Sequence, residues 1–214
     1  MRLVIGNKNY SSWSLRAWLP LRHFGLDFEE ERVALFEPGY RERILKRSPA
    51  GKVPVLIDGD VTVWESLAIG EYLAETCPEL EMWPTSAAER ALARSISAEM
   101  HAGFADLRSH MPMNIRGSYP GKGRTPGVDA DIARIRALWG QCLAGSGGPF
   151  LFGNFTIADA MYAPVATRFV TYGVALDPRS NEYVQQIWNL PAMREWRAAA
   201  QAETEFIADA EPYR

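Results

Sequence analysis

A proline-led β-hairpin that runs directly into a helix start is the feature that most restricts what this sequence can fold into. Residues 55–57 and 61–63 are short, mostly β-branched runs on either side of an Asp-Gly-Asp turn, which predicts an antiparallel hairpin. Pro54 opens the first strand and has no amide hydrogen, so the residue before it keeps backbone groups that are free to pair with a ligand. Ser66 directly precedes an apolar helical pattern and is predicted to be an N-cap, beside amides that hold a carboxylate readily. Taken singly, each piece is typical of an ordinary hairpin leading into a capped helix; their combination is what a site for a small anionic peptide requires.

Composition narrows the class of protein. The chain has 214 residues, 47% of them hydrophobic, which is enough for a substantial core in one or two domains. A net charge of −3 without a basic stripe disfavours a nucleic-acid partner. Cys77 and Cys142 lie far apart in apolar helical patterns, which favours reduced core thiols over a disulfide, and no metal-ligand spacing is present. We find no signal-peptide pattern and no run long enough to span a membrane, so we expect a soluble cytoplasmic protein without a membrane partner.

The first third of the chain alternates between strand and helix patterns. The expected elements are a strand at 2–5, a helix at 14–24, a strand at 28–34, a helix at 40–46, the hairpin and a helix from 66. This βαβαββα order predicts an α/β domain over residues 1–78. Pro78 and Pro84 stop helices, so residues 79–86 are expected to form a linker.

Every periodic segment after this linker is helical, which predicts an all-α domain over residues 87–214. One long amphipathic helix is expected from 87 to 111, ended by Pro112. Thr156 and Asp159 have the spacing of a capping box, in which a hydroxyl and a carboxylate satisfy two amides at a helix start. We therefore assign Asp159 a structural role, although a lone acid in an apolar setting also suggests an active site.

The order VPVL, turn, strand, ES-x-AI, together with the TIADA segment at 156–160, resembles the glutathione transferase family over nearly the whole chain. The resemblance implies a thioredoxin-like N-terminal domain, an all-helical C-terminal bundle, and glutathione as co-substrate without a metal. At the matching positions, the main chain of Val53 would pair with the cysteinyl part of glutathione, and Pro54 would follow a cis peptide bond. Glu65 and Ser66 would hold the γ-glutamyl end. Lys52 would contact the glycine carboxylate, a task suited to a point charge on a flexible stem.

The chemistry is expected in the loop after the first strand, residues 7–18. This loop is similar to the Ser-Ser-Cys-Ser-x-Arg signature of the zeta class, which implies that Ser11 is the catalytic hydroxyl and that Trp13 stands where that class has cysteine. Ser12 and Tyr10 stay open as alternative donors to the glutathione sulfur, and Ser12 or Ser14 is expected to cap the helix. Because no cysteine precedes position 77, a thiolate stabilised by a hydroxyl is favoured over thiol–disulfide exchange.

In this fold the electrophile pocket lies between the serine loop and the first helix of the second domain. Its candidate lining residues are Trp13, His101, Phe104 and Arg108. Three functions follow, in descending order: transfer of glutathione to a small hydrophobic electrophile, glutathione-dependent isomerisation resembling that of maleylacetoacetate isomerase, and non-catalytic binding of glutathione or a hydrophobic ligand. The departure at Trp13 favours conjugation over isomerisation. The resemblance also implies a homodimer.

Overall fold

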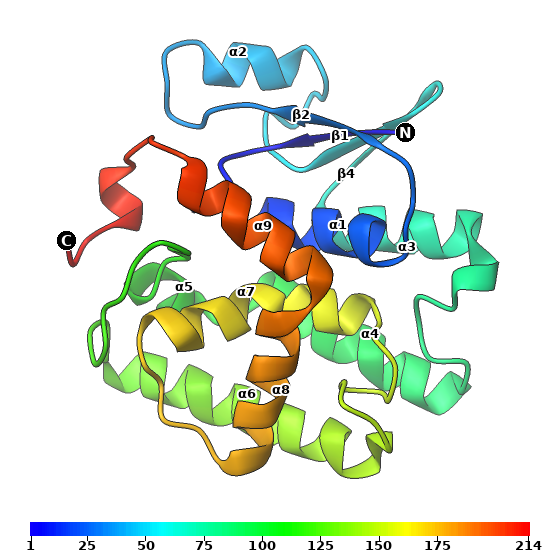
Figure 1. The fold of residues 1–214 in the computed structure, drawn as a ribbon. Coiled ribbons are helices and arrows are strands. Elements are labelled where there is room, and N and C mark those ends of the chain that lie inside the picture. Colours follow the sequence, from blue (N-terminus) through cyan, green and yellow to red (C-terminus); the bar gives the residue numbers. More distant parts are fainter.

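Four short strands form one mixed sheet in the N-terminal part of the chain (Figure 1). The computed structural model describes residues 1–214. The elements of this part are β1 (Arg2–Ile5), α1 (Ser12–His23), β2 (Glu29–Arg32), α2 (Tyr40–Leu45), β3 (Val55–Asp58), β4 (Val61–Trp64) and α3 (Ser66–Thr76). The strand order is β2-β1-β3-β4, with β1 parallel to β2 and antiparallel to β3, and the hairpin pairs β3 with β4. The βαβαββα order expected from the sequence is therefore confirmed.

The sheet lies between two unequal layers. Helices α1 and α3 lie on the side that faces the helical body, and α2 lies on the other side (Figure 1). Strand β1 serves both layers because successive side chains of a strand point to opposite faces. Leu3 and Ile5 belong to the main core, whereas Val4 belongs to a small second core. The other buried members of that second core are Val33, Ile44 and Val55.

All regular elements in the second part of the chain are helices. They are η1 (Pro78–Leu80), α4 (Ala87–Ala102), α5 (Ala105–His110), α6 (Pro126–Ser146), α7 (Ile157–Thr171), α8 (Pro178–Asn189), α9 (Pro191–Ala202) and η2 (Ala208–Ala210). Two isolated β-bridges lie in the loop before α7. Helix α7 is buried along almost its whole length and packs against α1, α4 and α8. One hydrophobic cluster of 48 buried residues runs from β1 to α9 and so includes both parts of the chain. The domain bounds at 78 and 87 stay a prediction.

The single helix expected over residues 87–111 is wrong, because the chain breaks between α4 and α5. Gly103 ends α4 through its amide, which donates to the carbonyl of Glu99 at 2.8 Å. A Cβ at Gly103 would lie 2.8 Å from that carbonyl oxygen, so only glycine fits there without a shift. Phe104 then has a φ of 57° and begins a new helix in another direction. Apolar periodicity continues through the break, which is why the sequence pattern did not reveal it.

Two helix caps also differ from expectation. Helix α1 begins at Ser12, and its N-cap is Ser11 rather than Ser12 or Ser14. The N-cap of α3 is Glu65, at a φ of 67°, so that Ser66 is the first residue of the helix.

The capping box at Thr156 and Asp159 is confirmed. Asp159 accepts hydrogen bonds from the amides of Leu151 and Thr156 and from two hydroxyls, which confirms its structural role.

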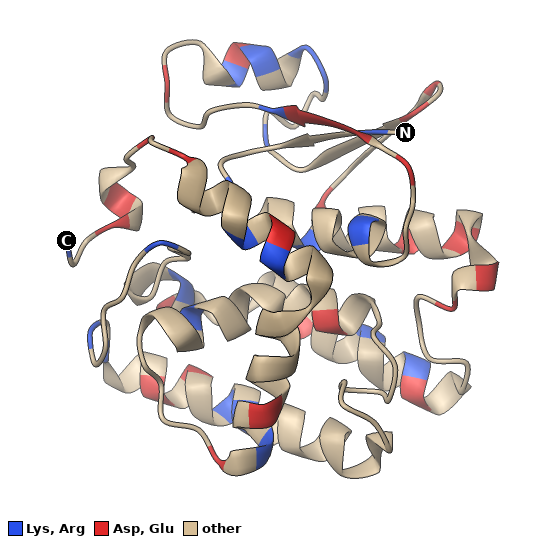
Figure 2. Cartoon of the chain, viewed as in Figure 1, with Lys and Arg blue, Asp and Glu red and all other residues tan.

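Charged residues of both signs are spread over the chain. Acidic and basic positions are interspersed over the helices and loops of both parts of the chain (Figure 2). None of the helices combines the length and the apolar character that crossing a bilayer requires.

Both cysteines are unpaired, and Cys142 is buried, which raises the pKa of its thiol to about 11.

Candidate functional site

A pocket of about 210 Å³ lies where the hairpin meets the start of α1. Its walls are Trp13, Ala50, Lys52, Val53, Pro54, Trp64 and Glu65. Four of the five residues predicted to bind glutathione are thus brought together. The peptide bond between Val53 and Pro54 is cis. The backbone amide and carbonyl of Val53 make no hydrogen bond within the chain, so both are free for a ligand.

Ser66, the fifth predicted residue, lies next to this pocket but does not line it. Only 2% of Ser66 is exposed, and its hydroxyl has no hydrogen-bond partner in the protein. Buried hydroxyls are nearly always paired, so an unpaired one beside a pocket indicates a group that a ligand satisfies. No side chain caps α3, and the amides of its first turn are therefore available to an anion.

The β1–α1 loop carries the three predicted hydroxyl donors to a second pocket, of about 430 Å³. Tyr10, Ser11 and Ser12 all line it, and Trp13 contributes to the walls of both pockets. A thiol held in the first pocket near Val53 would therefore lie close to the serine hydroxyls and face the second pocket. This shared wall is the central feature of the site.

The amide of Gly6 and the hydroxyls of Ser14 and Ser11 form a hydrogen-bonded chain at the start of α1. The amide of Gly6 donates to Ser14 Oγ at 3.0 Å, and Ser14 Oγ lies 2.7 Å from Ser11 Oγ. Ser14 is fully buried, and Ser11 is the only acceptor within reach of its hydroxyl proton. Ser14 therefore donates to Ser11, which also accepts from the Ser14 amide at 3.3 Å. The hydroxyl proton of Ser11 is left free to donate to a ligand in the second pocket. Ser12 Oγ makes no hydrogen bond to the protein.

Tyr10 is in a different position. Its hydroxyl donates to the carboxylate of Glu211 and lies 3.2 Å from the carbonyl of Glu205, and it accepts from Arg116 at 2.7 Å. Burial, followed by the hydrogen bond to Glu211, raises the pKa of Tyr10. This hydroxyl is thus engaged with the C-terminal segment and Arg116, and its alternative role as donor to the glutathione sulfur stays a prediction.

The second pocket combines apolar and cationic walls. Besides the loop, it is lined by Leu35, Phe36, Arg108, Pro112, Met113, Arg168, Ile207, Asp209 and Ala210. Arg108 lies 5.3 Å from the centre of the Trp13 ring, and the fully buried Arg16 lies 4.4 Å from it. Burial lowers the pKa of Arg168 to about 10, and burial, followed by the charges of Arg168 and Arg108, lowers that of Arg16. Both terminal nitrogens of Arg16 lack a partner, so positive charge gathers here with few acceptors.

Two predicted pocket residues lie outside both pockets. Phe104 is 7% exposed and belongs to the core, and its place in the wall of the electrophile pocket stays a prediction. His101 contacts the edge of the Trp13 ring, with centroids 5.1 Å apart, and pairs with Glu65 rather than facing a pocket. Arg168 and the C-terminal residues of the second pocket were not predicted from the sequence. An arginine within the continuous apolar run of α7 was a signal for the former, whereas nothing local indicates that residues 207–210 return to the loop.

No three metal-ligating side chains lie together in the chain. Most polar groups at the site are hydroxyls, backbone amides, arginines and Lys52, which suit an organic anion and a thiolate; the acids are Glu65 and Asp209. The arrangement as a whole can bind an anionic peptide in the first pocket, stabilise its thiolate at the serine loop and hold a second molecule beside it.

Two family models match the chain. They describe the N-terminal domain of glutathione S-transferase, over residues 10–76, and the C-terminal domain of glutathione S-transferase, over residues 89–199. The second match alone covers more than half of the chain.

Curated relatives and solved structures agree with these models. A probable maleylacetoacetate isomerase of Caenorhabditis elegans is 37% identical over 99 residues, 46% of this chain and 45% of that protein. The matched part therefore spans less than half of that relative. Maleylacetoacetate isomerase of Rattus norvegicus is 29% identical over 172 residues, 78% of this chain and 77% of that protein. A glutathione transferase homologue from Burkholderia, solved with bound glutathione, has a TM-score of 0.73 at 24% identity, covering 94% of this chain and 98% of its own, which shows a common fold.

Proposed function

The chain belongs to the glutathione S-transferase family, and we propose that it binds glutathione in the 210 Å³ pocket and transfers its thiolate to an electrophile in the 430 Å³ pocket. The observation that carries this proposal is the position of Ser11 in the second pocket, next to Trp13, which lines both pockets; the hydrogen bond from the buried Ser14 leaves the Ser11 hydroxyl proton free. The unpaired groups of Val53 and Ser66 support the same placement of the ligand.

In the first pocket, the chain's own groups hold the peptide at three points. Val53 offers its amide and carbonyl to the central residue, and Lys52 offers a positive charge to the glycine end. Glu65 and the start of α3, with the Ser66 hydroxyl, receive the γ-glutamyl end, because a carboxylate is stabilised at a helix N-terminus and an ammonium by a carboxylate. These contacts fix the sulfur beside α1.

Glutathione supplies the nucleophile, a thiolate. This form is scarce at neutral pH because a free thiol has a pKa of about 8.5. Ser11 donates its hydroxyl proton to the sulfur, and the N-terminal end of α1 adds a favourable dipole. Ser14, held by the Gly6 amide, polarises Ser11 in turn. The thiol proton leaves to solvent, the new C–S bond forms in the second pocket, and the electrophile's leaving group departs or its carbanion takes up a proton.

A second candidate function is glutathione-dependent isomerisation of a substrate that carries a carboxylate. Relatives named maleylacetoacetate isomerase support it, and so do Arg108 and Arg168 in the walls of the second pocket. Guanidinium groups are suited to bind carboxylates, and the only acid in those walls is the exposed Asp209. In this reaction the thiolate adds to a cis double bond, the bond rotates, and glutathione leaves unchanged.

One assay separates these functions. The protein is incubated with glutathione and either a neutral electrophile or a carboxylated electrophile of similar size, and products are identified by mass. A glutathione adduct supports transfer, whereas a cis-to-trans change with glutathione conserved supports isomerisation. Glutathione binding in calorimetry without either product contradicts both and indicates a non-catalytic binding protein.

An arginine variant then tests the charge of the electrophile. Arg108→Met should lower the ratio of kcat/KM for the carboxylated over the neutral electrophile by about tenfold, the loss of a charged hydrogen bond. The control is Arg134→Met, because Arg134 pairs with Glu99 on the surface and does not line the second pocket. An unchanged ratio assigns the pocket to neutral, hydrophobic electrophiles.

We further propose a homodimer in a reducing, cytoplasmic compartment. The unpaired state of both cysteines supports the compartment. The outer edge of β4 is unpaired and exposes Val61 and Trp64, which supports burial of this edge region against a second copy. Sedimentation that finds only a 23.9 kDa species at micromolar concentration would rule the dimer out.

A further inference from the structure

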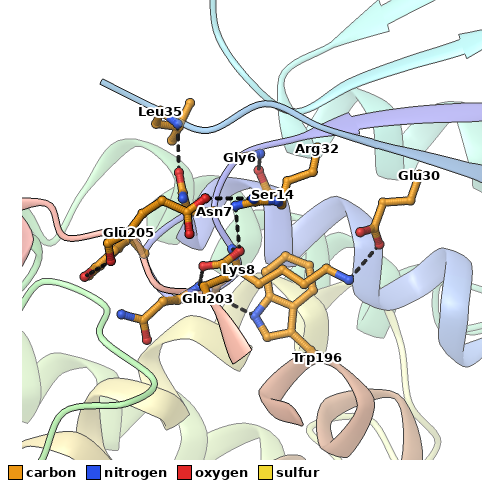
Figure 3. A network of polar contacts seen from close by, with 12 residues as sticks. Gly6, Asn7, Lys8, Ser14, Glu30, Arg32, Leu35, Trp196, Glu203 and Glu205 are labelled. Atoms are coloured by element: carbon orange, nitrogen blue, oxygen red, sulfur yellow. Dashed lines mark hydrogen bonds and ion pairs between the residues drawn. The ribbon is translucent and has the colours of Figure 1, made fainter. Parts of the chain in front are cut away.

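The serine loop is fastened to the C-terminal segment by one carboxylate. Glu203 follows directly after α9, and its two oxygens accept hydrogen bonds from the consecutive amides of Lys8 and Asn9, at 2.6 and 3.0 Å (Figure 3). Its side chain is only 6% exposed. Adjacent loop amides that converge on one carboxylate form a compact, charge-assisted contact.

These two amides belong to the turn that precedes the reactive serine. The carbonyl of Asn7 accepts from the amides of Tyr10 and Ser11, so the turn closes immediately before the N-cap of α1. Lys8 and Asn9 form the tip of this turn, and their amides have no backbone acceptor. Glu203 therefore provides the only acceptor for two donors whose position determines where Ser11 lies.

Other groups hold the same turn as well. The carbonyl of Asn9 accepts from the amide of Ile115 at 3.2 Å, and its Oδ1 accepts from the amide of Arg116 at 2.9 Å. Trp196 Nε1 donates to the carbonyl of Lys8 at 2.9 Å, and the Asn9 side chain pairs with Asn114 at 3.0 Å. The charge of Glu203 is itself compensated by Arg32, whose guanidinium lies 3.3 Å away, in the same group of side chains (Figure 3). Arg32 also pairs with Glu205 at 2.7 Å, but the Glu205 side chain contacts no loop amide. The two glutamates thus share a cation and differ in their contact with the loop.

We propose that Glu203 is a positioning residue for thiol activation, which holds the turn at Lys8 and Asn9 so that Ser11 points its hydroxyl at the glutathione sulfur. The inference rests on the proposed function. Glu203 lines neither pocket, so it acts only through the loop. A displacement of a catalytic group by about 1 Å is enough to cost up to about 100-fold in rate.

The position of Glu203 gives this role a distinctive signature. The residues that hold glutathione lie on the hairpin and α3 and have no contact with Glu203. A change at Glu203 should therefore raise the pKa of the bound thiol and lower the rate, and leave glutathione affinity unchanged. A residue needed only for folding would not separate these quantities.

The test compares Glu203→Gln with Glu205→Gln, which removes a charge next to the same arginine from a side chain that contacts no loop amide. Glutamine keeps one acceptor but turns an NH2 group toward one of the two amides. We expect Glu203→Gln to raise the pKa of the bound glutathione thiol by about one unit and to lower kcat/KM about tenfold, with the glutathione dissociation constant within twofold. Hydrogen exchange at Lys8 and Asn9 should quicken in this variant alone.

The outcomes are distinguishable. If the wild-type protein binds glutathione without forming a thiolate, both the proposed function and the role of Glu203 are wrong. If the wild type forms the thiolate but the thiol pKa is unchanged in Glu203→Gln, the role of Glu203 is wrong and the proposed function stands. The same holds if Glu205→Gln has an equal effect. Glu203→Ala should show a larger effect in the same direction; if it does not fold, the glutamine variant, checked by circular dichroism, decides.

Discussion

The imidazole Nε2 of His101 lies 3.5 Å from a carboxylate oxygen of Glu65, which joins α4 to the residue that caps α3. Glu65 is also a wall of the glutathione pocket, and His101 rests against the Trp13 ring that separates the two pockets. The pair thus connects the γ-glutamyl end of the proposed glutathione site to the helical part of the chain. Its titration reports on the site.

We expect His101 to titrate below its usual pKa of about 6.5 in the free protein. Burial lowers its pKa, Arg16 and Arg108 lower it further, and Glu65 raises it. Glu65→Gln should therefore lower the pKa of His101 still more. Because the folded pKa lies below the unfolded one, the protein loses stability as pH falls through this range, and His101→Gln should reduce that loss. Nuclear magnetic resonance titration of the imidazole measures the shift; a pKa at or above about 6.5 in the wild type contradicts burial as the dominant effect, and an unchanged pKa in Glu65→Gln contradicts the pairing.

Ser66→Ala should weaken glutathione binding by about 1–2 kcal/mol, the scale of a lost hydrogen bond to a charged group. The free protein should lose no stability, because the Ser66 hydroxyl has no partner there. Calorimetry with glutathione and urea unfolding measure the two effects separately. Unchanged affinity would show that this hydroxyl does not face the ligand, and lost stability would show that it has a partner within the chain.

Asp159→Ala should lower the free energy of unfolding by about 3–5 kcal/mol, because it leaves buried donors unpaired. These donors are the amides of Leu151 and Thr156 and the hydroxyl of Tyr183. The matched control is Asp129→Ala, an exposed acid in the first turn of α6 that pairs with Arg124 and should cost less than about 1 kcal/mol. Equal effects of the two substitutions in urea unfolding would contradict a structural role for Asp159.

Much of this fold follows from local patterns. The hairpin, the alternating first third and the Thr156 capping box are each determined by residues within a few positions of one another, so the sequence predicts them correctly. Gly103 shows the limit of this reasoning. The apolar repeat continues through it, and the break depends on a steric contact with the Glu99 carbonyl that only the folded chain reveals.

The site divides in the same way. The glutathione pocket is built from one continuous stretch of hairpin and helix start, and four of its predicted residues lie together. The second pocket brings together the loop between β1 and α1, α5, α7 and the C-terminal segment, which are far apart in sequence. Arg168, Ile207 and Glu203 could not be assigned from spacing, because their roles depend on how α7 and the chain end return to the serine loop.

The pKa of the bound glutathione thiol, followed through the ultraviolet absorbance of the thiolate, tests the central claim most directly. We expect a value well below the usual thiol pKa of about 8.5 in the wild type. Ser11→Ala should raise it by about one unit, Ser14→Ala by less, because Ser14 acts through Ser11. Ser12→Ala, the matched neighbour without a hydrogen bond to the chain, should leave it unchanged. A shift in Ser12→Ala alone would move the role to Ser12, and a wild-type pKa near about 8.5 that none of the three changes would contradict thiolate stabilisation by the serine loop.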